Sequence, residues 1–84
     1  MFAKVTSEKI LKRMIKDIKK SLKVKNVPEM NLVTELGVSS VKVFEIFLKL
    51  EQSFKVCFDE NEITLENLNN LPKLANLIFC KKQL

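Results

Sequence analysis

The chain has 84 residues, 46% of them hydrophobic and 30% charged, with a net charge of +5. This length suits one compact domain, and the composition is typical of a globular protein rather than a disordered one. The sequence contains no histidine, which excludes the usual Ser–His and Cys–His nucleophilic sites and any zinc site with an imidazole ligand. We therefore expect a binding or carrying protein that is not an enzyme and holds no metal.

The first predicted element is an amphipathic helix from about Ser7 to about Lys23. Thr6 and Ser7 are suitable N-cap residues, and Glu8 is favourable in a first turn. Apolar residues recur at spacings of three and four, which places them on one helix face, with the basic residues mainly on the other. The apolar set is Ile10, Leu11, Met14, Ile15, Ile18 and Leu22.

The positive charge belongs to this first segment and not to the whole chain. Up to Lys25, nine basic residues stand against Glu8 and Asp17, which gives a net charge of +7. From Asn26 onward, six basic residues stand against eight acidic ones, which gives −2. Two interpretations stay open: a solvated helix face, or contact with an acidic partner, a nucleic acid or a membrane surface.

No stretch approaches the roughly 18 apolar residues that a membrane span needs, and the N-terminus becomes charged too early for a signal peptide. We therefore expect a cytoplasmic protein without a membrane span. Cys57 and Cys80 lack CxxC spacing, and we interpret them as two reduced, partly buried thiols, with a disulfide between them left open.

A loop is expected between residues 26 and 37. Pro28 disfavours a helix at the preceding residue, and Gly37 suits a sharp turn. Several apolar residues inside the loop indicate that it packs over the core: Met30, Leu32, Val33 and Leu36.

The next predicted helix runs from Val41 to Phe54, with Ser39 as its N-cap and Ser40 in its first turn. It is more apolar than one narrow stripe requires, so we expect a central helix that is contacted on more than one side. The residues predicted for the core on this helix and the last one are Phe44, Phe47, Leu48, Leu50, Phe54, Leu74 and Ile78.

A brief helical turn is predicted near Glu62 to Leu65, and a last helix from near Asn70, with Pro72 in its first turn. No repeat or low-complexity segment interrupts the chain. The sequence therefore predicts one all-α domain over residues 1–84, a four-helix bundle of three main helices and one short helix.

The stretch from Leu36 to Phe58 resembles the central motif of the acyl and peptidyl carrier proteins. In that family Leu-Gly and an apolar residue precede Asp-Ser-Leu, and a helix follows with a glutamate five residues after the serine. Here Ser40 matches the serine, Val41 the leucine after it, Glu45 the glutamate, Leu50 and Glu51 a Leu-Glu pair, and Phe54 the closing aromatic residue. The resemblance implies the four-helix bundle of the acyl carrier type.

The resemblance also implies a function. A phosphopantetheinyl transferase would attach 4′-phosphopantetheine from coenzyme A to Ser40, and the arm would hold an acyl or aminoacyl group as a thioester. A loading enzyme and a downstream synthase or acyltransferase would be the other partners of a monomeric carrier, with no nucleic acid involved. The residues expected to contact these partners are Ser39, Val41, Lys42 and Glu45.

Three features depart from the family pattern. The loop between the first helix and the motif looks shorter than in the bacterial fatty-acid type. Ser39 stands where the family has an aspartate, and the central helix is neutral, with Lys42 and Lys49 against Glu45 and Glu51. Typical fatty-acid carriers are strongly acidic on this helix, and charge complementarity selects partners. The departures favour a specialised pathway (polyketide, nonribosomal peptide or an unusual fatty acid) over housekeeping fatty acid biosynthesis.

Several alternatives stay open. Ser40 could be an ordinary helix-capping serine, and Ser39 is a rival site of modification. Glu45 and Glu51 could be solvated residues instead of docking contacts. For the whole chain, the alternatives are an unmodified carrier-like interaction module and, third, a small basic nucleic-acid-binding domain. If the carrier function holds, the apolar core could open to shelter an acyl chain.

Overall fold

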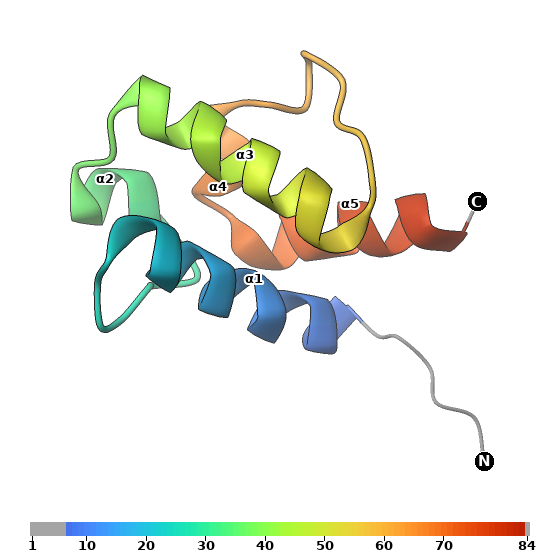
Figure 1. Ribbon diagram of the computed structural model, residues 1–84, viewed down its shortest axis with the longest axis horizontal. Helices are drawn as coiled ribbons and strands as arrows, with labels where there is room; N and C mark the ends of the chain where they lie inside the picture. The colour runs from blue at the N-terminus through green and yellow to red at the C-terminus, as the bar shows by residue number, and fades with distance from the viewer. Residues whose placement is uncertain (1–6, 84) are drawn as a thin grey trace.

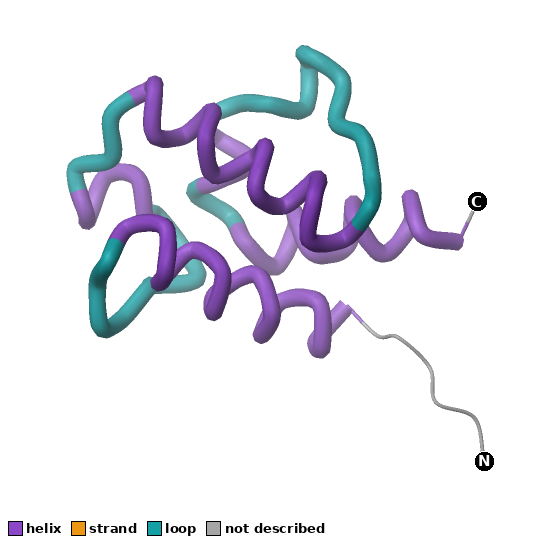
Figure 2. Tube along the Cα trace, in the orientation of Figure 1, coloured by secondary structure: helices purple, strands orange, loops and turns teal. Residues whose placement is uncertain are grey.

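The computed structural model describes residues 7–83, which form five helices and no strand. Figure 2 shows the helices and the loops that join them. The helices are α1 (Ser7–Leu22), α2 (Leu32–Leu36), α3 (Ser40–Phe54), α4 (Leu65–Leu68) and α5 (Leu71–Gln83). The predicted all-α class is confirmed for this part of the chain.

The three long helices run along the long axis of the molecule. Figure 1 shows α1 and α3 side by side in opposite directions, with α5 behind them. The short helix α2 lies at the end of the molecule where α3 begins, directly before the start of that helix. The α1 and α3 termini nearest to α2 therefore share one end of the molecule.

The core is apolar and is built from one face of each long helix. Helix α1 buries Ile10, Met14 and Ile18, and it packs most extensively against α5. Phe47 of α3 is fully buried and meets the ring of Phe58 edge to face, with ring centroids 5.2 Å apart. The other buried apolar residues are Val27, Leu32, Val43, Ile46, Leu50, Phe54, Leu68, Leu71, Leu74, Ala75 and Ile78.

Helix ends follow local chemistry closely. Helix α1 stops at Leu22 because Lys23 adopts a left-handed backbone with φ 57°. The short helix starts at Leu65 and not near Glu62, because the Thr64 hydroxyl accepts a hydrogen bond from the Asn67 N–H at 3.1 Å and so caps it. Thr6, the other predicted cap of the first helix, lies outside the described residues.

The largest difference from the sequence prediction is α2, which lies inside the segment expected to be a loop. Its start is held by hydrogen bonds to residues 69–71, where α4 ends and α5 begins. The Asn31 N–H donates to the Asn69 carbonyl at 2.6 Å, the Val33 N–H to Asn69 Oδ1 at 2.7 Å, and the Leu71 N–H to the Glu29 carbonyl at 2.9 Å. Five helices therefore replace the predicted four, and the acyl carrier type of bundle stays a prediction.

Helix α3 packs against both α1 and α4, in agreement with the expected contact on more than one side, but part of its apolar surface is exposed. Phe47 and Leu50 are fully buried, but Phe44 is 52% exposed and Leu48 is 41% exposed. Their assignment to the core was wrong. Helix α3 has one face in the core, and a second apolar face points away from it.

Two further expectations concern the surface. Among the helices of residues 7–83, none combines the length and apolar character that would let it cross a membrane. Cys57 and Cys80 are both free thiols. Both are exposed, so their predicted partial burial was wrong.

Candidate functional site

The two serines at the start of α3 occupy the point where the chain leaves α2. Gly37 ends α2 with a left-handed backbone (φ 62°), a conformation that glycine adopts without strain. Ser39 is extended, and α3 begins at Ser40. Only three residues separate the two helices, so α2 fixes the position of both serines.

The two serines have different tasks. The Ser39 hydroxyl accepts a hydrogen bond from the Lys42 N–H at 3.2 Å and caps α3, as predicted. Ser40 is exposed, and its hydroxyl has no hydrogen bond to any described residue. Because Ser39 already caps the helix, the Ser40 hydroxyl is left available to an incoming molecule.

The backbone around Ser40 suits a negatively charged group. The first N–H groups of a helix have no partner within it and carry the positive end of the helix dipole. The Lys42 N–H is bound to Ser39, whereas those of Ser40 and Val41 make no hydrogen bond within the described residues. A phosphate on Ser40 would therefore lie close to unpaired donors.

Lys42 and Glu45 form an ion pair one turn into α3. Lys42 Nζ lies 3.1 Å from Glu45 Oε1, and the side chains are 37% and 54% exposed. The pair is neutral, and exposed pairs of this kind contribute about 0–1 kcal/mol. Beside Ser40 the helix therefore presents a paired charge instead of an acidic surface.

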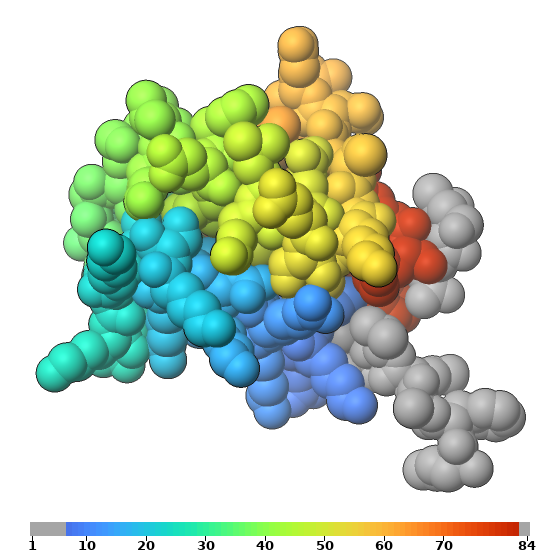
Figure 3. Space-filling view, viewed as in Figure 1, coloured from blue at the N-terminus to red at the C-terminus, as the bar shows by residue number. Residues whose placement is uncertain are grey.

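An apolar stripe follows Ser40 along the outer face of α3. It consists of Val41, Phe44 and Leu48, which are 71%, 52% and 41% exposed. Their spacing of three and four places them on one side of the helix. Figure 3 shows the side chains of α3 forming the upper front surface of the molecule, beside those of α1. This stripe is an exposed apolar surface next to the serine.

A hollow of about 280 Å³ adjoins Ser39 on the other side. It lies where the end of α1, the end of α2 and the start of α3 meet. Its lining is mostly apolar, with polar groups only on the α3 side: Leu22, Val24, Leu36, Gly37, Val38, Ser39 and Lys42. The hollow brings the last turn of α1 next to the two serines.

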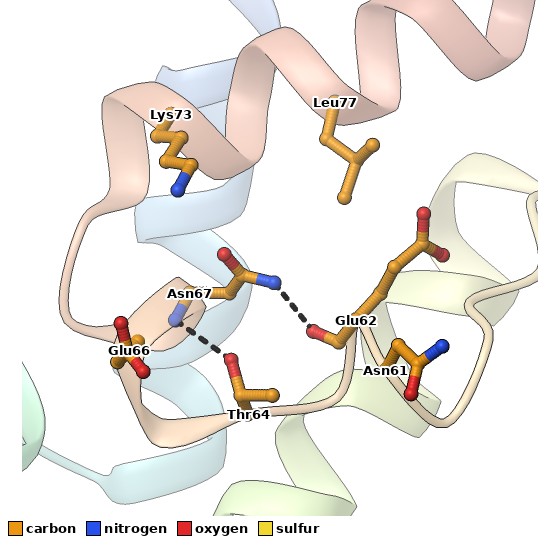
Figure 4. A pocket seen from close by; sticks show the side chains of 7 residues that line it. All are labelled: Asn61, Glu62, Thr64, Glu66, Asn67, Lys73 and Leu77. Carbon is orange, nitrogen blue, oxygen red and sulfur yellow. Dashed lines mark hydrogen bonds between the residues drawn. The ribbon is translucent and has the colours of Figure 1, made fainter.

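A larger hollow, of about 390 Å³, lies elsewhere, between α4 and α5. Figure 4 shows that its polar groups serve each other: the Asn67 amide donates to the Glu62 carbonyl at 2.7 Å, and the Asn67 N–H donates to the Thr64 hydroxyl. Its lining is Asn61, Glu62, Thr64, Glu66, Asn67, Lys73 and Leu77, and none of these belongs to the segment that carries Ser40. We interpret this hollow as a by-product of the cap of α4.

The far end of α3 is fixed by charged side chains whose part in the fold could not be predicted from the sequence. Glu51 Oε2 accepts a hydrogen bond from the Phe58 N–H at 2.8 Å. The last carbonyls of the helix accept from Arg13, which binds Ser53 at 2.8 Å, and from Lys82, which binds Phe54 at 3.2 Å. Glu51 therefore holds the following loop in place, which gives it a structural task.

The outer surface of α1 is a second candidate site, which we name the basic face: Lys9, Lys12, Arg13, Lys16, Lys19 and Lys20. At about 100° per residue these side chains fall in an arc of about 120°, with Glu8 and Asp17 just outside its two edges. Apart from half-buried Lys19, all are exposed. The structure thus gathers most of the net charge on one side of one helix.

Most of these charges have no internal counter-charge. Within the described residues, Lys12, Lys16, Lys19 and Lys20 form no ion pair, whereas Lys42 and Lys81 do. Lys16 stands three or four positions from four other basic residues of the same face. Each such like-charge pair destabilises a helix by about 0.2–0.5 kcal/mol.

The predicted site residues thus lie together at the start of α3. Ser39, Ser40, Val41, Lys42 and Glu45 occupy its cap and first two turns. No cluster of three or more metal-ligating side chains is found among residues 7–83. The α2 helix behind the site was missed, and the repeated apolar residues at 30, 32, 33 and 36 were its only signal.

No protein-family model, no curated protein and no solved structure matches the chain.

Proposed function

We propose that this protein is an acyl or aminoacyl carrier that is modified with 4′-phosphopantetheine on Ser40. The observation that supports this most is the division between the two serines. Ser39 caps α3, while the Ser40 hydroxyl is exposed and has no hydrogen-bond partner among the described residues. An ordinary capping serine would use its hydroxyl for the helix, as Ser39 does.

The residues present fit a phosphodiester at this position. The unpaired N–H groups of Ser40 and Val41 can bind phosphate oxygens at the start of α3. The arm itself would supply a terminal thiol for thioester chemistry. The protein's own task is to present and orient the attachment point.

Attachment needs an external enzyme. A serine hydroxyl is a weak nucleophile unless a nearby base takes its proton. The sequence has no histidine, and the nearest carboxylate along α3, that of Glu45, is paired with Lys42. Within the described part of the chain no base is hydrogen-bonded to the Ser40 hydroxyl, which supports a substrate of a transferase and not an enzyme.

The apolar stripe supports docking of partner enzymes beside Ser40. Val41, Phe44 and Leu48 together offer exposed apolar area next to a neutral ion pair. A loading enzyme, a transferase and a downstream synthase or acyltransferase would meet an apolar surface there instead of an acidic one. This difference favours a specialised biosynthetic pathway.

The test is intact-mass measurement after incubation with coenzyme A and a broad-specificity phosphopantetheinyl transferase. The native sequence should gain one phosphopantetheine, and Ser40→Ala should gain none. Ser39→Asp keeps a capping side chain and restores the family's aspartate, so it should be modified at least as fast.

Other results have definite meanings. A gain that survives Ser40→Ala but not Ser39→Ala would move the site to Ser39. If no transferase from several pathways modifies the folded native protein, an unmodified interaction module becomes the better hypothesis.

A further inference from the structure

We propose that the basic face of α1 binds the protein reversibly to an anionic membrane surface. The proposal rests on α1 alone and does not depend on modification of Ser40. Its starting point is the set of lysines at positions 12, 16, 19 and 20, which have no ion pair among the described residues. Their mutual repulsion lowers the stability of the helix, and a polyanionic surface would relieve it.

Several acidic residues lie away from the basic face, which favours contact with an extended surface. Figures 1 and 3 show the tip of the loop that follows α3 at the rim opposite α1, and this loop contains Asp59 and Glu60. Glu8 and Asp17 lie at the edges of the basic face and not within it. An extended anionic surface that contacts α1 would therefore have these loop carboxylates on its far side, where screening removes their repulsion within a Debye length.

The chemistry of the face favours a membrane over a nucleic acid. Its side chains are five lysines and one arginine, which bind phosphates and guanine, but it has none of the amide, hydroxyl or aromatic groups that read the other bases or stack on them. Helix α1 also packs against α5 and α3 along its length, so it does not project from the molecule as a groove-reading helix does.

Binding should depend on charge alone. The apolar side chains of α1 face the core, where Ile10, Met14 and Ile18 are buried, so the basic face brings no residue to insert among lipid tails. Each lysine near an anionic leaflet strengthens binding by roughly five-fold. The expected association is fast, reversible and sensitive to salt.

The experiment is co-sedimentation with vesicles of phosphatidylcholine alone or mixed with phosphatidylserine. The full chain should sediment only with the mixed vesicles at low salt, and salt should release it. Lys16→Glu changes the charge at the centre of the face by two units and should weaken binding roughly 25-fold. Lys73→Glu, which makes the same change in net charge beside α4, should leave binding within about two-fold.

A folding control accompanies these variants. Lys16→Glu converts repulsive pairs into attractive ones, so its melting temperature should rise by several degrees, and weaker binding cannot then be attributed to unfolding. Ser40→Ala should bind vesicles like the native protein, whatever the result of the phosphopantetheine test.

Four results would overturn the proposal. They are equal binding to both kinds of vesicle, no binding at low salt, an equal loss in Lys73→Glu, and tighter binding to a DNA duplex or to polyglutamate than to mixed vesicles at the same salt concentration. The last result would assign the basic face to a nucleic acid or to an acidic protein instead.

Discussion

Helices α1 and α3 lie side by side but divide their surfaces in different ways. Helix α1 follows the simple amphipathic rule, with apolar residues inside and basic residues outside. Four of these lysines, at positions 12, 16, 19 and 20, form no ion pair within the described residues. Helix α3 has a buried apolar face, a second exposed apolar stripe and a charge pair that neutralises itself.

The difference shows that a small domain can leave two different kinds of surface exposed, one charged and one apolar. On α1 the exposed surface is charged: neighbouring basic residues repel each other, and four of the lysines form no ion pair among residues 7–83. On α3 the exposed surface is the apolar stripe, whose side chains contact water although the core lies on the other face of the same helix. Each departs from what stability alone would select, and such departures concentrate at functional sites.

The largest expected effect tests the two faces of α3. Phe47→Ala removes a fully buried ring in contact with Phe58 and should lower the free energy of unfolding by about 3–5 kcal/mol. Phe44→Ala, on the exposed stripe, should cost much less, about 1 kcal/mol or below. Urea unfolding of both variants measures the difference. Similar losses would mean that the stripe is covered in solution.

A smaller effect separates the two serines. Ser39→Ala removes the cap of α3 and should cost about 1 kcal/mol, whereas Ser40→Ala should stay within about 0.5 kcal/mol of the native protein. Thermal unfolding of the unmodified proteins is the measurement. A larger loss for Ser40→Ala would show that Ser40 has a structural task.

A change of similar size but opposite sign in the free energy of unfolding tests how far the basic face destabilises the fold. Lys16→Glu should stabilise the fold by about 1 kcal/mol in dilute buffer, because Lys12, Arg13, Lys19 and Lys20 all lie three or four positions away. The gain should shrink as salt is added. A destabilised variant would contradict the view that these charges repel each other.

The smallest effect concerns a lysine that does have a counter-charge. Lys81 Nζ lies 2.9 Å from Glu62 Oε1, and its hydrogen bond to that carboxylate is the main reason why the pKa of Glu62 is lowered from 4.5. A lowered pKa in the folded state contributes stability above pH 4.5, which is lost as the pH falls through the lowered value.

Glu62→Gln should therefore cost about 0.2–1 kcal/mol at neutral pH, and the difference from the native protein should vanish in acid. Urea unfolding at a series of pH values measures this. Glu60→Gln, at an exposed position without an ion pair among the described residues, is the matched control and should have no effect. A loss of stability that persists unchanged in acid would exclude this origin.

Much of the fold could be predicted because its signals are local. The 3–4 spacing of apolar residues gave α1 almost to the residue, and the Ser39 cap and the start of α3 followed from helix-start chemistry. These features depend on neighbours within about four positions, which the sequence displays directly.

The rest depends on contacts between distant parts of the chain. Helix α2 is held by Asn69, which lies 36 positions from Val33, and no local pattern indicates that pairing. The exposure of Phe44 and Leu48 was missed because the apolar pattern of a helix does not show whether another element of the fold covers each residue. The residues of the candidate site were therefore predicted from the sequence. The helix α2 that precedes the site and the exposure of the apolar stripe were not.

The hydrogen bonds between residues 29–33 and residues 69–71 also have a consequence for the order of folding. Contacts between distant positions form after local ones, because a long loop must close first. As the chain leaves the ribosome, α1 and α3 can form before the segment that anchors α2 has been made. The segment around Ser40 would therefore reach its native structure only after residue 71 has emerged, and an enzyme that recognises this structure could act only on a chain that has folded to that point.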